Sequence, residues 1–416
     1  MTALFQLNCK NPNHRHSNKS FESQSDSTRD SITYHSTERV VFYIENSGSV
    51  APYLHSIDSE LKTTLLELTQ IPHFRDIPKS YYFIDGKSIQ YIGNDLSSLK
   101  RNLIPQNFQA PTSDLNETFR MVLDSVPNQI SVLLTDGLYD ISDKSDVDCY
   151  IEKPDERLTR ETVLLRSLFN QRISDTEFHT ILLKAISSFS GSYYYATKPG
   201  VCSVRIDQNR PYYYFLFGES NILNLKSFRS YLEKMNHVKE LASFKKLSDT
   251  DNKLSIELSH YRPNQTRGSY TICREELNCL NGIKTDRSGQ GFDFKFKADF
   301  SHFHWFNSII ESIDAYELSN SNFYISDVSS ISESQFTHEI TVSSDSKNIY
   351  DRNLEISLSS CYLPGWIIDS SSTDETFIVD DTSTTWGLEM IMTAIGESYC
   401  VENQNQIAKL NFKLKK

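Results

Sequence analysis

The chain has 416 residues and a formal net charge of -12, from 54 acidic and 42 basic side chains. This length predicts two domains, each able to bury a full core. The acidity argues against nucleic acid or an anionic membrane as the partner, because phosphate contacts need clustered Lys and Arg. The sequence also lacks a long apolar segment and a recognisable secretory signal. We therefore expect a cytoplasmic protein that binds neither membranes nor nucleic acid.

The N-terminal half alternates apolar strands with amphipathic helices. Strands that are apolar on both faces need helices on both sides of the sheet, so the pattern predicts an α/β, doubly wound, mostly parallel sheet over residues 38–240. A polar leader over 1–37 precedes it. The predicted strands are 40–45, 80–84, 129–135, 178–185 and 212–217, and the predicted helices are 52–70, one from Asp114 onward, 158–171 and 224–235.

The C-terminal part has a different texture from about residue 250. Alternating strands such as 292–300 and 354–358, separated by Ser, Asn and Asp turns, predict a mainly antiparallel β-sandwich over 250–408. We expect a helix at 386–398 to cover this sandwich and a short basic tail at 409–416. The seven cysteines are scattered and form no Cys-x-x-Cys pair, so free thiols are expected rather than a disulfide framework.

Oxygen-bearing side chains gather at three strand or loop ends. Glu45, Ser47 and Ser49 directly follow the first strand, Ser113 lies in a loop that enters a helix, and Asp136 directly follows the third strand. Ligands of open α/β sheets bind at the carboxyl ends of the strands. Carboxylates and hydroxyls are the ligands of a hard cation, which predicts an Mg²⁺ or Mn²⁺ site. The simpler alternative is a polar turn whose serine hydroxyls cap the next helix.

These residues resemble the metal-ion-dependent adhesion site (MIDAS) of the von Willebrand factor A (vWA) domain. That site has the pattern Asp-x-Ser-x-Ser, then a Thr in a second loop and an Asp in a third. Here Glu45 replaces the first Asp, Ser47 and Ser49 match the two serines, Ser113 takes the Thr position and Asp136 takes the last. The resemblance covers about residues 38–235. It implies a vWA fold and a metal that is completed by a carboxylate from a partner protein.

The resemblance implies a vWA-domain adaptor that binds another protein, within a multi-protein bacterial system of the stress or defence type. We do not expect an enzyme, because the sequence contains none of four common catalytic motifs: a P-loop, His-Glu-x-x-His, Gly-x-Ser-x-Gly or a dinucleotide-binding Gly-x-Gly-x-x-Gly after the first strand. Three alternatives stay open: an Mg²⁺-dependent enzyme that uses the same oxygens, a purely structural protein whose loops hold no ion, and a surface adhesin. A zinc site at His302 and His304, expected on one strand face, or at Cys9, His14 and His16, lacks a convincing fourth ligand.

Overall fold

The computed structural model describes most of the chain beyond residue 36. The predicted leader therefore lies outside the described residues except for its last position, and Ser113 lies outside them too. Contacts gather His35–Lys416 into one unit. The described ranges are 37–110, 114–124, 129–139, 153–173, 178–195, 203–219, 221–247, 254–262, 266–286, 291–332, 335–346, 352–375, 378–400 and 406–416.

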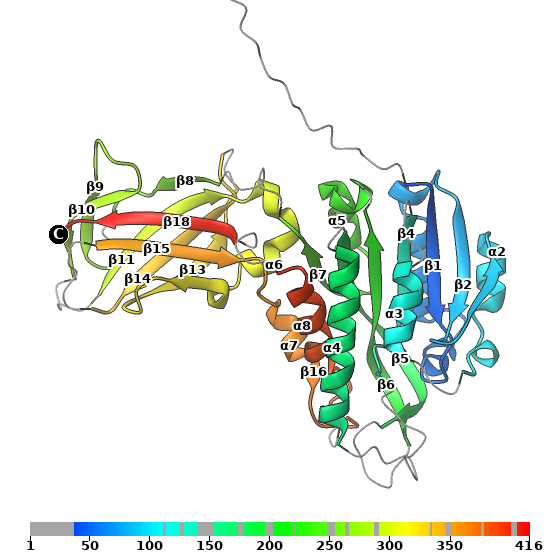
Figure 1. Ribbon diagram of the computed structural model, residues 1–416. Coiled ribbons are helices and arrows are strands. Elements are labelled where there is room, and N and C mark those ends of the chain that lie inside the picture. The colour runs from blue at the N-terminus through cyan, green and yellow to red at the C-terminus, as the bar shows by residue number, and fades with distance from the viewer. Residues whose placement is uncertain are drawn as a thin grey trace, which may run out of the picture. The chain divides into compact units, whose positions relative to one another are not determined.

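A seven-stranded sheet organises the N-terminal half, with helices on both faces (Figure 1). Its strand order is β3-β2-β1-β4-β6-β5-β7. The bounds are β1 Arg39–Glu45, β2 Lys79–Ile84, β3 Ile89–Gly93, β4 Gln129–Thr135, β5 His179–Tyr194, β6 Ser203–Gly218 and β7 Val238–Lys245.

The direction of the strands departs from the mostly parallel sheet that the sequence predicts. Only the neighbours β1–β2 and β1–β4 are parallel, whereas β2–β3, β4–β6, β5–β6 and β5–β7 are antiparallel. An apolar strand shows that both faces of a sheet are covered, but it carries no information about strand direction. A parallel connection between the strands at 178–185 and 212–217 would need a crossover helix. The sequence predicts no helix there, and this absence was the overlooked sign of antiparallel strands. The α/β class is confirmed and the sheet is mixed.

The helices divide the buried apolar residues of this sheet into two clusters. Helix α1 packs on one face through Leu61, Leu65 and Leu68, and α3 and α4 pack on the other. The predicted helix at 52–70 is broken, because the Ser59 side chain accepts a hydrogen bond from the Lys62 N–H and starts α1 there. The bounds are η1 Ala51–Leu54, α1 Glu60–Thr69, η2 Pro72–Phe74, α2 Leu96–Asn102, η3 Pro105–Asn107, α3 Leu115–Asp124, α4 Pro154–Ile173, η4 Asn221–Asn224 and α5 Lys226–Leu232.

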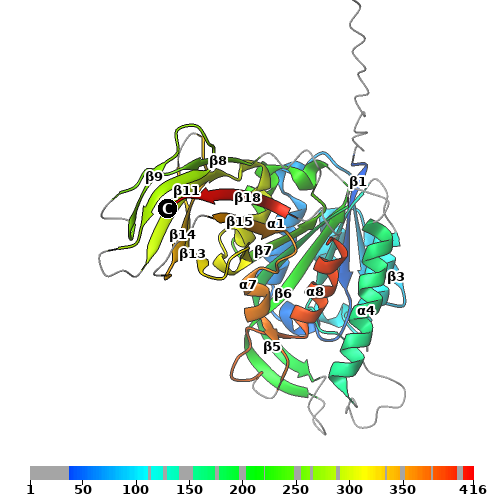
Figure 2. The ribbon, with the colours of Figure 1, turned by 60° about the vertical axis from the view of Figure 1, so that its left-hand side comes forward.

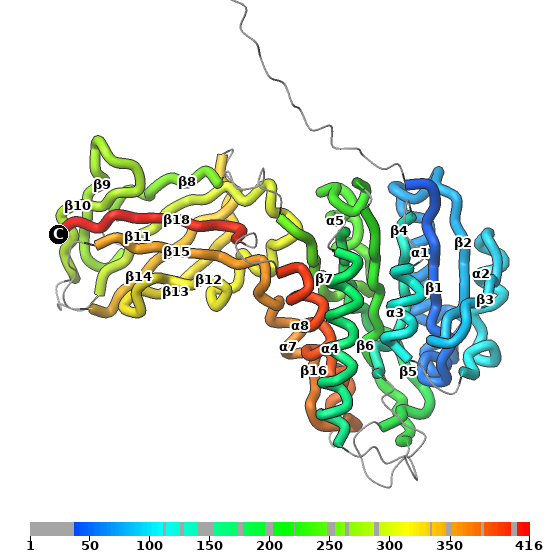
Figure 3. The backbone as a smooth tube through the Cα atoms, viewed as in Figure 1, coloured from blue at the N-terminus to red at the C-terminus, as the bar shows by residue number. Residues whose placement is uncertain are grey.

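Two further sheets follow, ordered β12-β15-β18-β10-β9 and β13-β14-β11-β8, and Figure 3 shows β15 and β18 side by side. Strand β18 covers most of the stretch predicted as a tail. The strands are β8 Ser255–Leu258, β9 Ser269–Ile272, β10 Cys279–Lys284, β11 Phe292–Asp299, β12 Tyr316–Leu318, β13 Phe323–Ser330, β14 His338–Ser344, β15 Arg352–Ser359 and β18 Gln406–Leu414. Short helical elements precede β12, namely η6 Ser301–Phe306, α6 Asn307–Ile310 and η7 Ile313–Ala315.

Between β15 and β18 the chain makes an excursion, which we define as residues 361–400. It contains α7 Gly365–Asp369, β16 Ser371–Ser372, β17 Thr385–Trp386 and α8 Leu388–Ser398. The expectation that this last helix covers the sandwich is wrong. Helix α8 lies beside α4 in both Figure 1 and Figure 2, and its apolar side chains join the cluster of α3, α4 and the seven-stranded sheet.

Two disulfides also correct the expectation of free thiols. One joins Cys273 to Cys279, and the other joins Cys361 to Cys400 at the two ends of the excursion. Spacing along the chain gave no hint of the second pair, because 39 residues separate its members. Within the described part of the chain, no helix is both long and apolar enough to cross a membrane.

Candidate functional site

The carboxyl ends of β1 and β4 lie next to each other in the sheet. The two strands are parallel neighbours, and Ile44 pairs with Leu134 at the last step of their ladder. The chain leaves β1 into the loop that carries Ser47 and Ser49, and it leaves β4 at Asp136. These three predicted residues therefore come together at one edge of the sheet, which we call the β1/β4 edge.

The two serines and Asp136 form a polar cluster in which Ser47 and Asp136 are buried and Ser49 is half-buried. The Ser47 and Ser49 Oγ atoms are 2.8 Å apart, and Asp136 Oδ1 accepts a hydrogen bond from the Leu138 N–H at 3.1 Å. Ser47 is 4% exposed and Asp136 is 2% exposed. The Gly48 N–H donates to the Ala110 carbonyl, so the loop that leads toward residue 113 begins beside these serines.

Burial raises the pKa of Asp136 above its ordinary value. A hydrogen bond from the Ser49 hydroxyl, the Leu138 N–H and the charge of Arg210 each lower that pKa in part. The balance still favours the protonated acid more than in water, because removing a carboxylate from solvent penalises its charged form. A further positive charge at this edge would therefore stabilise the ionised form of Asp136.

Glu45 is fully buried as the last residue of β1. It pairs with Ile84 of β2, and Ile84 belongs to the cluster on the α3 and α4 face. Directly paired residues point to the same face of a sheet, so Glu45 points toward that face. The sequence did not anticipate this direction, because it gives no measure of the strand's rotation at its end.

Arg210 is a part of the site that the sequence analysis missed. It is 1% exposed, and its Cζ lies 4.4 Å from the ring centre of Tyr193 and 5.7 Å from that of Phe189. Because β6 runs antiparallel to β4, with Tyr213 paired to Thr135, the start of the apolar run of β6 lies at the β1/β4 edge. This arginine lies just before the aromatic run of β6. A prediction that β6 runs antiparallel to β4 would therefore have placed it at the β1/β4 edge.

The excursion also reaches this edge. The Tyr193 hydroxyl donates to Glu375 Oε1 at 2.5 Å, and the Tyr213 and Thr385 hydroxyls are 2.9 Å apart. Thr385 is fully buried, and a Cβ added to Gly137, the residue after Asp136, would lie 3.5 Å from its methyl group. Glu375 and Thr385, which lie 239 and 249 positions beyond Asp136 in the sequence, therefore help to build the surroundings of the predicted site.

The spacing of the two serine hydroxyls is compatible with a hard cation. Adjacent ligands of an octahedral Mg²⁺, each roughly 2.0 to 2.1 Å from the ion, lie about 2.9 Å apart, close to the Ser47–Ser49 separation. Asp136 Oδ2 is buried and makes no hydrogen bond with any described residue. No described group of three His, Cys, Asp or Glu side chains could hold a metal, so the two hydroxyls would have to serve as ligands.

Comparison with protein-family models, with curated proteins and with solved structures finds no match for this chain.

Proposed function

We propose that this chain is a vWA-type adaptor that binds another protein through the β1/β4 edge. The observation that carries the proposal is the juxtaposition of Ser47, Ser49 and Asp136 at the ends of two parallel neighbouring strands. Their order along the chain and their oxygen chemistry agree with the resemblance to the adhesion site. A multi-protein bacterial system of the stress or defence type is the setting that we propose for it.

Mg²⁺ or Mn²⁺ would be held by the Ser47 and Ser49 hydroxyls and by Asp136, with Glu45 and Ser113 as further predicted ligands. When bound, the cation would supply a positive centre with an open position for a carboxylate oxygen of the partner. The chain's own residues orient that centre: the Gly48–Ala110 hydrogen bond fixes the serine loop, and the Leu138 N–H fixes the Asp136 carboxylate.

Crosslinking capture in the native host tests the proposal. Tagged wild-type protein is compared with Ser49→Ala and Asp136→Ala, and with Asp124→Ala as a matched control. Asp124 is 62% exposed and lies at the far end of α3 from the β1/β4 edge. We expect one defined partner to be captured by the wild type and the control and lost from both edge variants. A partner captured equally by all four folded proteins would contradict the proposal.

The surface adhesin is a second candidate because of the two disulfides. Disulfides persist mainly in oxidising compartments, and both Cys273–Cys279 and Cys361–Cys400 are paired. Alkylation of free thiols in whole cells, followed by mass spectrometry, separates the two settings. Blocked pairs in a surface fraction favour the adhesin, whereas four alkylated thiols in a cytosolic fraction favour the adaptor.

A further inference from the structure

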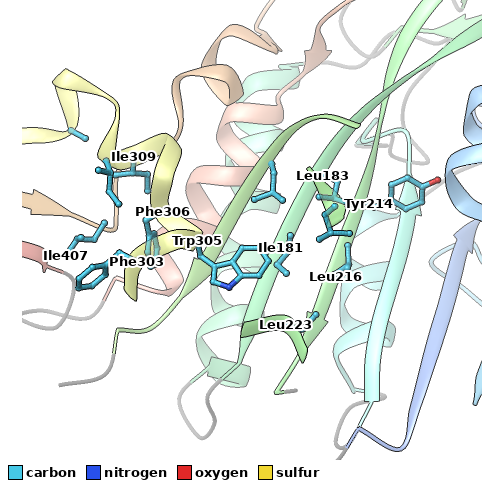
Figure 4. Close-up of a cluster of buried hydrophobic side chains, with 14 of the residues drawn as sticks. Ile181, Leu183, Tyr214, Leu216, Leu223, Phe303, Trp305, Phe306, Ile309 and Ile407 are labelled. Atoms are coloured by element: carbon cyan, nitrogen blue, oxygen red, sulfur yellow. The ribbon is translucent and has the colours of Figure 1, made fainter. Parts of the chain in front are cut away.

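A second polar cluster lies far from the β1/β4 edge, around Trp305 of η6. The His179 and Trp305 ring centres are 5.0 Å apart in an edge-on arrangement, and those of His304 and Trp305 are 5.8 Å apart. The Arg229 Cζ lies 5.8 Å from the Trp305 ring centre. Figure 4 shows Trp305 close to Ile181 of β5, in the same buried cluster as Phe303 and Phe306.

Each of these four side chains has a buried nitrogen that makes no hydrogen bond with a described residue. The atoms are His179 Nδ1, His304 Nε2, Trp305 Nε1 and Arg229 Nη1. His179 is 1% exposed, Trp305 is 2% exposed and Arg229 is 7% exposed. A buried polar nitrogen without a partner costs about 1 to 3 kcal/mol, so four of them around one indole ring favour a ligand in this cluster.

The charges around the cluster favour an anion as that acceptor. Burial lowers the pKa of His179, and the positive charges of Lys245 and His304 lower it further. Burial also lowers the pKa of His304, and Lys245 and Arg229 act in the same direction, whereas hydrogen bonds to the backbone of Ser301 and Asn224 raise it in part. Every charged group that acts on these two imidazoles is therefore cationic.

One acidic side chain approaches, but it faces another atom of the arginine. Glu233 Oε1 accepts from Arg229 Nε at 2.7 Å and is 43% exposed, which leaves Nη1 available toward the cluster. The second nitrogen of His179 is also engaged, with Nε2 2.7 Å from Ser243 Oγ. This bond holds the ring so that Nδ1 is the atom left for a ligand.

A metal ion is the weaker explanation. Two imidazole nitrogens are suitable zinc ligands, but no described group of three His, Cys, Asp or Glu side chains could complete such a site. The guanidinium of Arg229 and the ammonium of Lys245 would also repel a cation. The sequence expectation of His302 and His304 on one strand face is wrong, because both lie in the helical element η6 and His302 is exposed.

We propose that the Trp305 cluster is a binding site for one small oxyanion, a phosphate or carboxylate group. The indole and guanidinium N–H groups donate to its oxygens, and His179 and His304 add donors on the other sides. His304 is half-buried, so the ligand reaches the site past this residue. The site is separate from the β1/β4 edge, and it goes beyond the proposed function.

Thermal unfolding with inorganic phosphate, sulfate and acetate, against chloride at matched ionic strength, tests the proposal. An anion that binds only the native state raises Tm in a saturable way. We expect this rise with at least one of the three anions; acetate alone would identify a carboxylate ligand, and phosphate with sulfate a tetrahedral one. Trp305→Phe, which keeps a flat ring and removes the N–H, and His304→Gln should each weaken the apparent Kd about tenfold, the effect of about 1.4 kcal/mol.

His302→Gln is the matched control, because this exposed histidine lies in the same element, and it should behave as the wild type. The affinity for the anion should also rise as the pH falls from about 8 to about 6. A bound anion favours the protonated forms of His179 and His304 and so raises their pKa, although the charges of Lys245 and Arg229 oppose this shift. The proposal fails if none of the anions raises Tm saturably, as expected when buried water satisfies the four nitrogens. It also fails if Trp305→Phe and His304→Gln keep the wild-type Kd.

Discussion

The Tyr193 hydroxyl donates a 2.5 Å hydrogen bond to the Glu375 carboxylate across 182 positions of sequence. Tyr193 is 1% exposed and Glu375 is 1% exposed. The bond joins the C-terminal end of β5 to the excursion, beside the Arg210 guanidinium that packs on the same tyrosine ring. The surroundings of the β1/β4 edge thus depend on residues from both halves of the chain.

Removing this hydroxyl should destabilise the protein. Tyr193→Phe deletes a buried hydrogen bond to a charged acceptor, which contributes about 1.5 to 3 kcal/mol. We expect a loss of that size in the free energy of urea unfolding. Tyr194→Phe is the control, because Tyr194 is 52% exposed and should change the free energy by less than about 0.5 kcal/mol. Equal effects of the two variants would show that the Tyr193–Glu375 bond does not stabilise the fold.

Helix α8 should stabilise the seven-stranded sheet. Ile395 is fully buried in the cluster that α8 shares with α4 and the sheet, so Ile395→Ala should cost about 2 to 5 kcal/mol. Glu397→Ala removes only an exposed ion pair with Arg166 and should cost less than about 1 kcal/mol. Unfolding followed by far-UV circular dichroism checks both values. An unchanged midpoint for Ile395→Ala would mean that the helix does not pack on the sheet.

The sequence predicted most of the strands and helices but not the role of the excursion. The apolar stripe of α8 showed that the helix has a buried face, and nothing in that stripe says which surface it covers. Proximity along the chain favoured the sandwich, yet β15 and β18 pair directly and send the intervening residues back to α4. Long-range returns of this kind depend on tertiary packing, which local periodicity cannot report.

The candidate site was predicted in part for a similar reason. Ser47, Ser49 and Asp136 follow strands whose ends could be read from apolar runs, so their placement at one edge followed from the general geometry of open sheets. Arg210 and Glu375 were missed because one needs the direction of β6 and the other needs the path of the excursion. Ser113 stays a prediction, since it lies outside the described residues.

Glu60 should make stability depend on acid pH. Burial alone would raise its pKa, but its own backbone N–H, the Ser188 N–H and hydroxyl, and the Ser187 hydroxyl lower it to about 2. A depressed folded-state pKa contributes stability above the unfolded value of 4.5, and this stability is lost as the pH falls toward about 2. We expect Glu60→Gln to cost about 1 to 2 kcal/mol at neutral pH, after allowance for solvent screening.

The measurement is urea unfolding of both proteins from neutral pH down to about pH 2. The difference between them should shrink as the acid titrates in the unfolded and then the folded state. A difference that stays constant over this range would mean that the Glu60 carboxylate is not preferentially ionised in the folded protein.

Asp136 should show the opposite dependence in the absence of divalent cations. Its folded-state pKa is raised, first by burial, so its favourable contribution is present below the unfolded pKa of 3.8 and is lost as the pH rises through the folded pKa. Asp136→Asn keeps an acceptor for the Leu138 N–H without the charge. With chelator present, this variant should gain stability relative to wild type as the pH rises, and a constant or reversed difference would contradict this.

The β1/β4 edge is tested most directly by thermal unfolding with chelator, Mg²⁺ and Mn²⁺, for the wild type, Asp136→Ala and the Asp124→Ala control. A cation at a hundredfold its Kd should add about 2.7 kcal/mol to native stability. We expect a saturable rise in Tm for the wild type and the control, and none for Asp136→Ala. A wild-type Tm that ignores both cations, or an equal rise in Asp136→Ala, would contradict a metal-dependent recognition site at Ser47, Ser49 and Asp136.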